Sequence, residues 1–130
     1  MTKGGSKNIS IANKTRAIVP RLPFADIAKS IVGATYELSV AFVTPTEARR
    51  IARTYKGKDY AANVLSFRLD KKSGELIMCP ATAKAEAPDF GRNYKEHMLA
   101  LFIHGLLHLD GHTHGGTMEK QEIRLIRKYS

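Results

Sequence analysis

The most constraining part of this sequence is an apolar segment that precedes a cluster of histidines near the C-terminus. Residues 93–109 carry apolar side chains at Met98, Leu99, Phe102, Ile103, Leu106, Leu107 and Leu109. Their spacing predicts a largely buried helix. Gly111 follows this segment, and glycine readily ends a helix because it tolerates the left-handed conformation after the last turn. We expect the rest of the chain to pack around this helix.

Two histidines lie four residues apart on the expected helix. Residues at i and i+4 share one face, about 6 Å apart along the axis, so His104 and His108 can reach one ion. A chain that turns back after Gly111 can present His112 or His114 as a third ligand. A bare pair with this spacing is often structural, but the following glycine and two further histidines favour a metal site here.

Three imidazoles suit a zinc ion and leave a fourth tetrahedral position open for water, as in catalytic zinc sites. Bound zinc lowers the pKa of that water to roughly 7, so hydroxide is available at neutral pH. Nickel and copper also accept imidazole ligands, so the sequence does not fix the metal. Position 105 is glycine, so the chain lacks the glutamate that serves as base in HExxH zinc proteases.

Length and cysteine content limit the class of protein. The 130 residues suit one domain with a modest core. We expect a loose polar tail over residues 1–8 and a single domain over residues 9–130. The sequence holds no apolar run of the length that a membrane span needs. The single cysteine, Cys79, forbids an internal disulfide, suits the reducing cytoplasm, and is expected to be a small buried residue in a strand.

The chain is strongly basic. It carries 21 Lys and Arg against 12 Asp and Glu, which gives a net charge of +9 and a pI near 9.9. Such an excess favours polyanionic partners, because each phosphate that is neutralised releases counterions. The positive residues are scattered along the chain, so a solvated lysine-rich surface is the alternative interpretation.

Strand and helix patterns alternate along the chain. Expected strands are 9–12, 36–43, 63–69 and 75–79, and expected helices are 23–32, 45–55, 93–109 and 117–128. Thr44 and Glu47 predict a capping box around Pro45 at the first helical position. The strands 63–69 and 75–79 are expected to form a hairpin, whereas 81–87 is ambiguous. This alternation predicts a layered α/β or α+β fold.

Three motifs together resemble one known family. Residues 104–114, HGLLHLDGHTH, resemble the HGxLHLxGxDH signature of the YbeY-type endoribonucleases, the rRNA maturation factors. Residues 63–67, NVLSF, resemble the family's TDVLSF or TNVLSF, and residues 74–77, GELI, resemble its GDI or GDL strand. The motifs follow one another in family order over residues 36–122.

The resemblance implies a small mixed β-sheet packed with helices, with the metal site in a cleft on a helix and the following loop. It assigns the zinc ligands to His104, His108 and His114, and so prefers His114 over His112. It implies a zinc-dependent, single-strand-specific endoribonuclease that matures the 3′ end of small-subunit (16S) rRNA and takes part in ribosome quality control. The implied partners are rRNA and the small ribosomal subunit, and no membrane.

The chain departs from the family pattern at two positions. Lys56 stands where the family usually has an arginine thought to be catalytic. Lysine keeps the charge that neutralises a phosphoryl oxygen but lacks the planar fork of guanidinium, so Lys58 or Arg68 could substitute. Thr113 stands where the family usually has an aspartate. If that aspartate orients a ligand, Asp110 or Glu122 could compensate.

Two other functions stay open at this point. The protein could instead be a ribosome-assembly module that binds RNA without cutting it, in which the metal only stabilises the fold. A hydrolase of another substrate, such as a peptidase, would need a base from elsewhere in the fold. His97 lies seven residues before His104, about 10 Å away along the helix axis and too far to share one ion. We expect His97 to be a cleft-lining or half-buried side chain.

Overall fold

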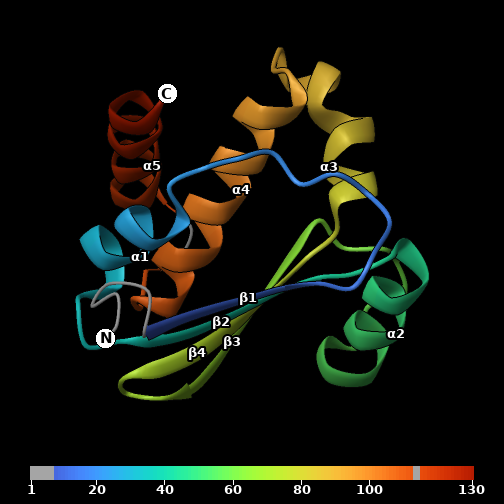
Figure 1. Ribbon diagram of the computed structural model, residues 1–130, viewed down its shortest axis with the longest axis horizontal. Helices are drawn as coiled ribbons and strands as arrows, with labels where there is room; N and C mark the ends of the chain where they lie inside the picture. The colour runs from blue at the N-terminus through green and yellow to red at the C-terminus, as the bar shows by residue number, and fades with distance from the viewer. Residues whose placement is uncertain (1–7, 113–114) are drawn as a thin grey trace.

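A four-stranded mixed sheet forms the middle of the molecule (Figure 1). The computed structural model describes residues 8–112 and 115–130. The strands are β1 (Ile9–Asn13), β2 (Glu37–Phe42), β3 (Val64–Asp70) and β4 (Ser73–Met78), in the order β1-β2-β4-β3. β1, β2 and β4 run parallel, and β3 pairs antiparallel with β4 as the expected hairpin.

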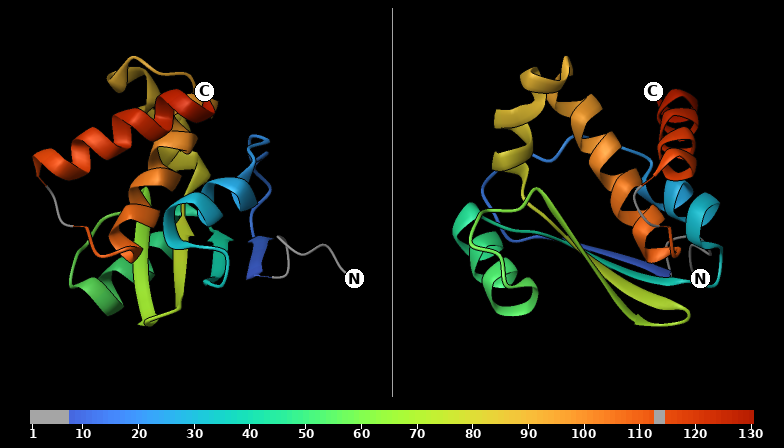
Figure 2. Two further views of the ribbon diagram at one scale, coloured as in Figure 1. Left: turned by 90° about the vertical axis from the view of Figure 1, so that its left-hand side faces the viewer. Right: turned by 180° about the vertical axis from the view of Figure 1, so that it is seen from behind.

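The helices lie on both faces of this sheet (Figures 1 and 2). They are α1 (Phe24–Val32), α2 (Pro45–Lys56), α3 (Pro80–Glu86), α4 (Tyr94–Leu109) and α5 (Gly116–Tyr129), with the short 3-10 helix η2 (Ala87–Phe90) between α3 and α4. The structure therefore confirms the expected small mixed sheet packed with helices. None of the helices in the described ranges is both long and apolar enough to cross a membrane.

Side chains that alternate along β2 divide the core into two clusters. Val40 and Phe42 pack with α1, α4 and α5, whereas Ala41 packs with α2 on the opposite face. This division follows from the two-residue period of a strand. Cys79, directly after β4, is fully buried in the α2 cluster, as expected for a small hydrophobic residue. Helices α1, α4 and α5 thus pack on one face of the sheet, and α2 packs on the other.

The α4 helix confirms the expected central element. Asn93 caps it by accepting from the backbone N–H of Glu96, and the Glu96 carboxylate accepts from the N–H of Asn93, each at 2.8 Å. This reciprocal capping box satisfies two backbone donors at the start of the helix. Gly111 lies two residues after its end with φ of 93°, the left-handed conformation expected of the terminating glycine.

Glycine at position 105 lets α4 lie directly on the sheet. A Cβ added there would lie 2.9 Å from Cδ2 of Leu76 and 3.1 Å from Cγ2 of Val64. Both distances are shorter than an ordinary carbon–carbon contact. The position that carries glutamate in HExxH proteases therefore faces the sheet in this chain, and a glutamate there would be packed against strands β3 and β4.

Replacing Gly105 with valine is expected to destabilise the fold by about 2–3 kcal/mol, because the added carbons overpack a tight contact between α4 and the sheet. Urea unfolding measures this free energy. Gly116→Ala is the control, since a Cβ at Gly116 meets nothing within 4 Å. Equal unfolding midpoints for Gly105→Val and the wild type would show that the helix does not need this close approach.

One local expectation is wrong, and one ambiguous segment is now assigned. Thr44 caps α2 by accepting from the N–H of Glu47 at 3.3 Å. The Glu47 carboxylate does not complete the capping box but instead accepts two hydrogen bonds from Arg50, each at 2.8 Å. The ambiguous segment 81–87 forms most of α3, which begins at Pro80. Of the expected tail, 1–8, only Asn8 lies within the described residues, and its side chain donates to the carbonyl of Ala34.

Candidate functional site

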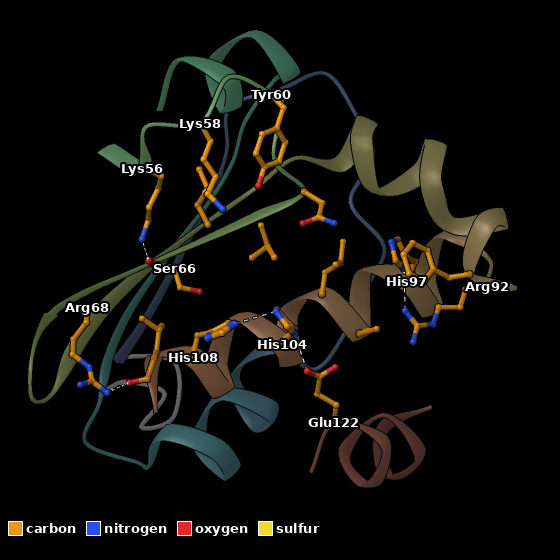
Figure 3. Close-up of a pocket in the computed structure, with 17 residues that line it drawn as sticks. Lys56, Lys58, Tyr60, Ser66, Arg68, Arg92, His97, His104, His108 and Glu122 are labelled. Carbon is orange, nitrogen blue, oxygen red and sulfur yellow. Dashed lines mark hydrogen bonds and ion pairs between the residues drawn. The ribbon is translucent and has the colours of Figure 1, made fainter. Parts of the chain in front are cut away.

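A cavity of about 830 Å³ opens between α4 and the hairpin strand β3 (Figure 3). Its lining includes His104, His108, Ser66, Arg68, Lys56 and Lys58. The histidines come from α4 and the lysines from the end of α2 and the loop after it. The fold thus brings the histidine pair and the basic residues of the sequence analysis to opposite walls of one cavity.

The two histidines converge on one point. The Nε2 atoms of His104 and His108 lie 3.1 Å apart, and the ring planes are inclined at 79°. Zinc–nitrogen bonds of about 2.0–2.1 Å in a tetrahedron place two ligand nitrogens roughly 3.3 Å apart. The spacing of the two Nε2 atoms is therefore close to that of two ligands on one tetrahedral ion.

Hydrogen bonds at the other ring nitrogens fix how the histidines present Nε2. Nδ1 of His104 lies 2.7 Å from Oε1 of Glu122, and Nδ1 of His108 lies 3.2 Å from the carbonyl oxygen of His112. Carboxylate and carbonyl oxygens only accept, so these two contacts favour the tautomer with the proton on Nδ1, which is the tautomer that binds a metal ion through Nε2. Two lone pairs aimed at one point fit a cation, as expected of metal-ligating histidines.

The third ligand lies outside the described residues. His114 and Thr113 both fall in the gap at 113–114, so the assignment of His114 stays a prediction. Within 8–112 and 115–130, no three His, Cys, Asp or Glu side chains gather in a way that could hold a metal ion. The side chain of His112, the rival ligand, lies 3.5 Å from Asp110.

Glu122 reaches the histidine pair from the closing helix. Its helix α5 packs on α4 through the buried residues Met118 and Leu125, and this contact brings the Glu122 carboxylate beside His104. Of the two carboxylates considered as compensation for Thr113, Glu122 contacts an expected ligand, whereas Asp110 contacts His112. Glu122 therefore has the position of a residue that orients a metal ligand.

Lys56 lies on the wall of the cavity opposite the histidines (Figure 3). Its ammonium donates to the carbonyl oxygen of Ser66 at 3.2 Å and lies 4.8 Å from the centroid of the Phe67 ring. These contacts hold the charge at the cavity wall. Arg68 also lines the cavity and donates to the carbonyl of Leu109 at 2.9 Å, so one of its nitrogens caps the end of α4.

The loop that carries Lys58 and Tyr60 is tied to α2. Between them, the carboxylate of Asp59 accepts a hydrogen bond from Arg53 and lies 3.9 Å from Arg49. The hydrogen bond from Arg53 and the charge of its guanidinium lower the pKa of Asp59. Lys58 and Tyr60 point from this loop into the cavity (Figure 3). The ion pair thus places a second lysine and an aromatic side chain on the basic wall.

The family model of the endoribonuclease YbeY matches residues 5–129 of this chain. The chain belongs to the endoribonuclease YbeY family. The YbeY endoribonuclease of Paraburkholderia phytofirmans is 37% identical over 116 residues, which cover 85% of this chain and 76% of that relative. The YbeY endoribonuclease of Neisseria meningitidis serogroup B is 40% identical over 107 residues, covering 70% of this chain and 63% of that relative.

A solved structure shares the fold. The solution structure of TM1509 from Thermotoga maritima superposes with a TM-score of 0.66, covering 93% of this chain and 88% of the other at 21% identity. At this identity the similarity bears on the fold alone. The mixed sheet and the helices around it are therefore found in a solved structure as well as in this member of the YbeY family.

His97 lines the cavity, as the sequence led us to expect for this YbeY-family chain. Its side chain is 1% exposed, so it is buried rather than half-buried. Nε2 lies 2.8 Å from Glu86, and Nδ1 lies 3.2 Å from Arg92. The expectation that His97 does not share an ion with His104 agrees with these partners. The sequence analysis missed Phe90, Arg92 and Tyr60 as cavity residues, because no periodic pattern marks the loops that carry them.

Proposed function

We propose that this chain is a metal-dependent endoribonuclease that cuts single-stranded RNA. The observation that carries the proposal is the pair of Nε2 atoms, of His104 and His108, 3.1 Å apart in a cavity with basic side chains on its opposite wall. The relatives are endoribonucleases by name, and this supports the reaction class. The direct test is cleavage of a single-stranded RNA by metal-loaded protein.

We further propose zinc as the metal, with His104, His108 and His114 as its ligands. When bound, zinc supplies an activated water for hydrolysis of a phosphodiester bond. The chain contributes two imidazoles whose Nδ1 protons are engaged by Glu122 and by the backbone of His112. Nickel and copper suit the same donors, so the metal content of the purified protein tests this part of the proposal.

Lys56 is the proposed catalytic cation. Its ammonium is held at the wall across the cavity from the histidines, where it can stabilise the negative charge that builds on the phosphoryl oxygens in the transition state. Lys58 lines the same wall and adds to the attraction for the RNA backbone. Both lysines act as point charges, without the bidentate geometry of arginine.

Replacing Lys56 with methionine is expected to lower kcat about 10²-fold, because one preorganised charge at the reacting phosphate is lost. Lys56→Arg is expected to retain or raise kcat. Lys84→Met removes an equal charge from α3, where the ammonium lies over the Tyr94 ring, and serves as the control. Steady-state cleavage of a fluorescent RNA measures all three; equal kcat for Lys56→Met and Lys84→Met would remove Lys56 from the mechanism.

The proposed biological substrate is the 3′ end of small-subunit (16S) rRNA, with a role in ribosome quality control. The net charge of +9 supports a polyanionic partner such as rRNA within the small ribosomal subunit. The proposed location is the cytoplasm, which the single cysteine supports. Cleavage of precursor rRNA in isolated small subunits by added protein tests this assignment.

A second candidate is a non-catalytic RNA-binding module of ribosome assembly with a structural metal. It is favoured by Lys56 in place of the family arginine, since the ammonium donates to the Ser66 carbonyl and has no bidentate fork. This function predicts that chelation unfolds the protein and that RNA is bound without being cut. A protein that stays folded without metal would contradict it.

A further inference from the structure

The cavity extends past the histidine pair to an exposed aromatic ring at the start of α4. Phe90, the last residue of η2, is 59% exposed although it lines the same cavity as His104. Arg92 lines this end as well, and Figure 3 shows Arg92 beside His97, beyond His104 along the helix. Single exposed apolar side chains are common on protein surfaces, but Phe90 differs from an exposed residue such as Ile123 because it lines this cavity.

The orientation of the Phe90 ring is fixed by a stacking contact on one of its faces. The buried ring of His97 stacks on it, with centroids 4.8 Å apart and planes inclined at 24°. His97 is itself held at both nitrogens, by Glu86 at 2.8 Å and by Arg92 at 3.2 Å. Oε1 of Glu86 also accepts from the side chain of Asn63. Residues from two helices and two loops therefore hold one aromatic ring in place.

The Phe90 ring is contacted by His97 and Arg92 but stays open to the cavity. The His97 ring stacks on one face of Phe90, and the Arg92 guanidinium lies 5.6 Å from the Phe90 centroid. With these contacts in place, the Phe90 side chain is still 59% exposed and lines the cavity. The exposed part of the ring is therefore available to a ligand in the cavity.

We propose that Phe90 is a stacking platform for one unpaired RNA base that flanks the cleaved bond. The inference rests on the proposed function and names the feature of the substrate that this end of the cavity recognises. Base stacking on aromatic side chains is the usual means of holding single-stranded RNA, because every base has a π face. His97 lies seven residues, about 10 Å, from His104 along α4, so the stacked base belongs to a neighbouring nucleotide.

Positively charged side chains beside Phe90 can bind the phosphates of the same RNA strand. Arg92 is next to Phe90, and Lys58 lines the cavity from the opposite wall. Their charges attract phosphates irrespective of sequence. A paired base cannot stack on Phe90 without leaving its duplex, so this platform selects unpaired RNA.

The test compares Phe90→Leu, which keeps an apolar side chain but removes the π face, with Phe90→Trp, which enlarges it. Ile123→Ala, at an exposed residue of α5, is the surface control. Zinc-loaded proteins are mixed rapidly with single-stranded RNA that carries 2-aminopurine at successive positions. Fluorescence quenching gives stacking and the Kd before cleavage, and product formation is followed in the same samples.

We expect the wild type and Phe90→Trp to quench 2-aminopurine at one position, and Phe90→Leu to lose this quenching and bind about tenfold or more weakly. Binding of fully paired RNA is expected to be equal in all four proteins. Unchanged quenching and Kd in Phe90→Leu would overturn the platform even where the wild type cuts RNA. Position-specific quenching without any cleavage would support the platform and contradict the proposed catalysis. No binding of any RNA by the wild type would overturn both.

Discussion

Replacing His108 with alanine is expected to remove both metal binding and RNA cleavage. His108 supplies one of two Nε2 atoms that lie 3.1 Å apart, and a three-histidine site that loses one ligand no longer encloses the ion. Metal analysis after dialysis should find about one zinc per chain in the wild type and only a small fraction of that in the variant. Cleavage should fall below detection. A variant that retains a full complement of zinc would contradict the site.

The same measurement identifies the third ligand. With His114 as the ligand, His114→Ala is expected to lose zinc, whereas His112→Ala is expected to keep it because the His112 side chain lies beside Asp110. The contact of His112 with His108 uses its backbone carbonyl, which alanine retains. The reverse outcome would assign His112 to the metal.

Replacing Glu122 with alanine is expected to weaken zinc binding about 10- to 100-fold. The Glu122 carboxylate, on α5, fixes the tautomer and the orientation of the His104 ring. Glu122→Gln keeps an acceptor oxygen and is expected to lose less. Competition with a chelator of known affinity measures both. Glu119→Ala removes an equal charge from an exposed position of the same helix and is the control. If Glu122→Ala binds zinc as tightly as Glu119→Ala does, the carboxylate has no orienting role.

The central helix and the histidine pair could be predicted because their signals are local. The apolar spacing before Gly111 and the i, i+4 separation of His104 and His108 both lie within one element. Period and capping preferences describe such elements well. The hairpin of β3 and β4 was predicted for the same reason, whereas the alanine-rich segment of α3 carries no clear period.

The contacts around the histidines could not be predicted, because they join elements that meet only in the folded chain. Glu122 reaches His104 across 18 residues of sequence, and no spacing rule links the two. Phe90 becomes a cavity residue because His97, Glu86 and Arg92 fix its ring. Lys56 was predicted from the motif and does line the cavity, but its contact with the Ser66 carbonyl depends on how α2 and β3 approach.

The most direct test is cleavage of a single-stranded RNA that spans the 3′ end of small-subunit rRNA. Zinc-loaded wild type, chelator-treated wild type and His108→Ala are compared at equal concentration, with circular dichroism to show that each is folded. Metal-dependent hydrolysis at this site predicts cleavage by the zinc-loaded wild type alone, and recovery of cleavage when zinc is restored to the chelated protein. Cleavage at the same rate by folded His108→Ala or by metal-free protein would contradict the metal-dependent mechanism.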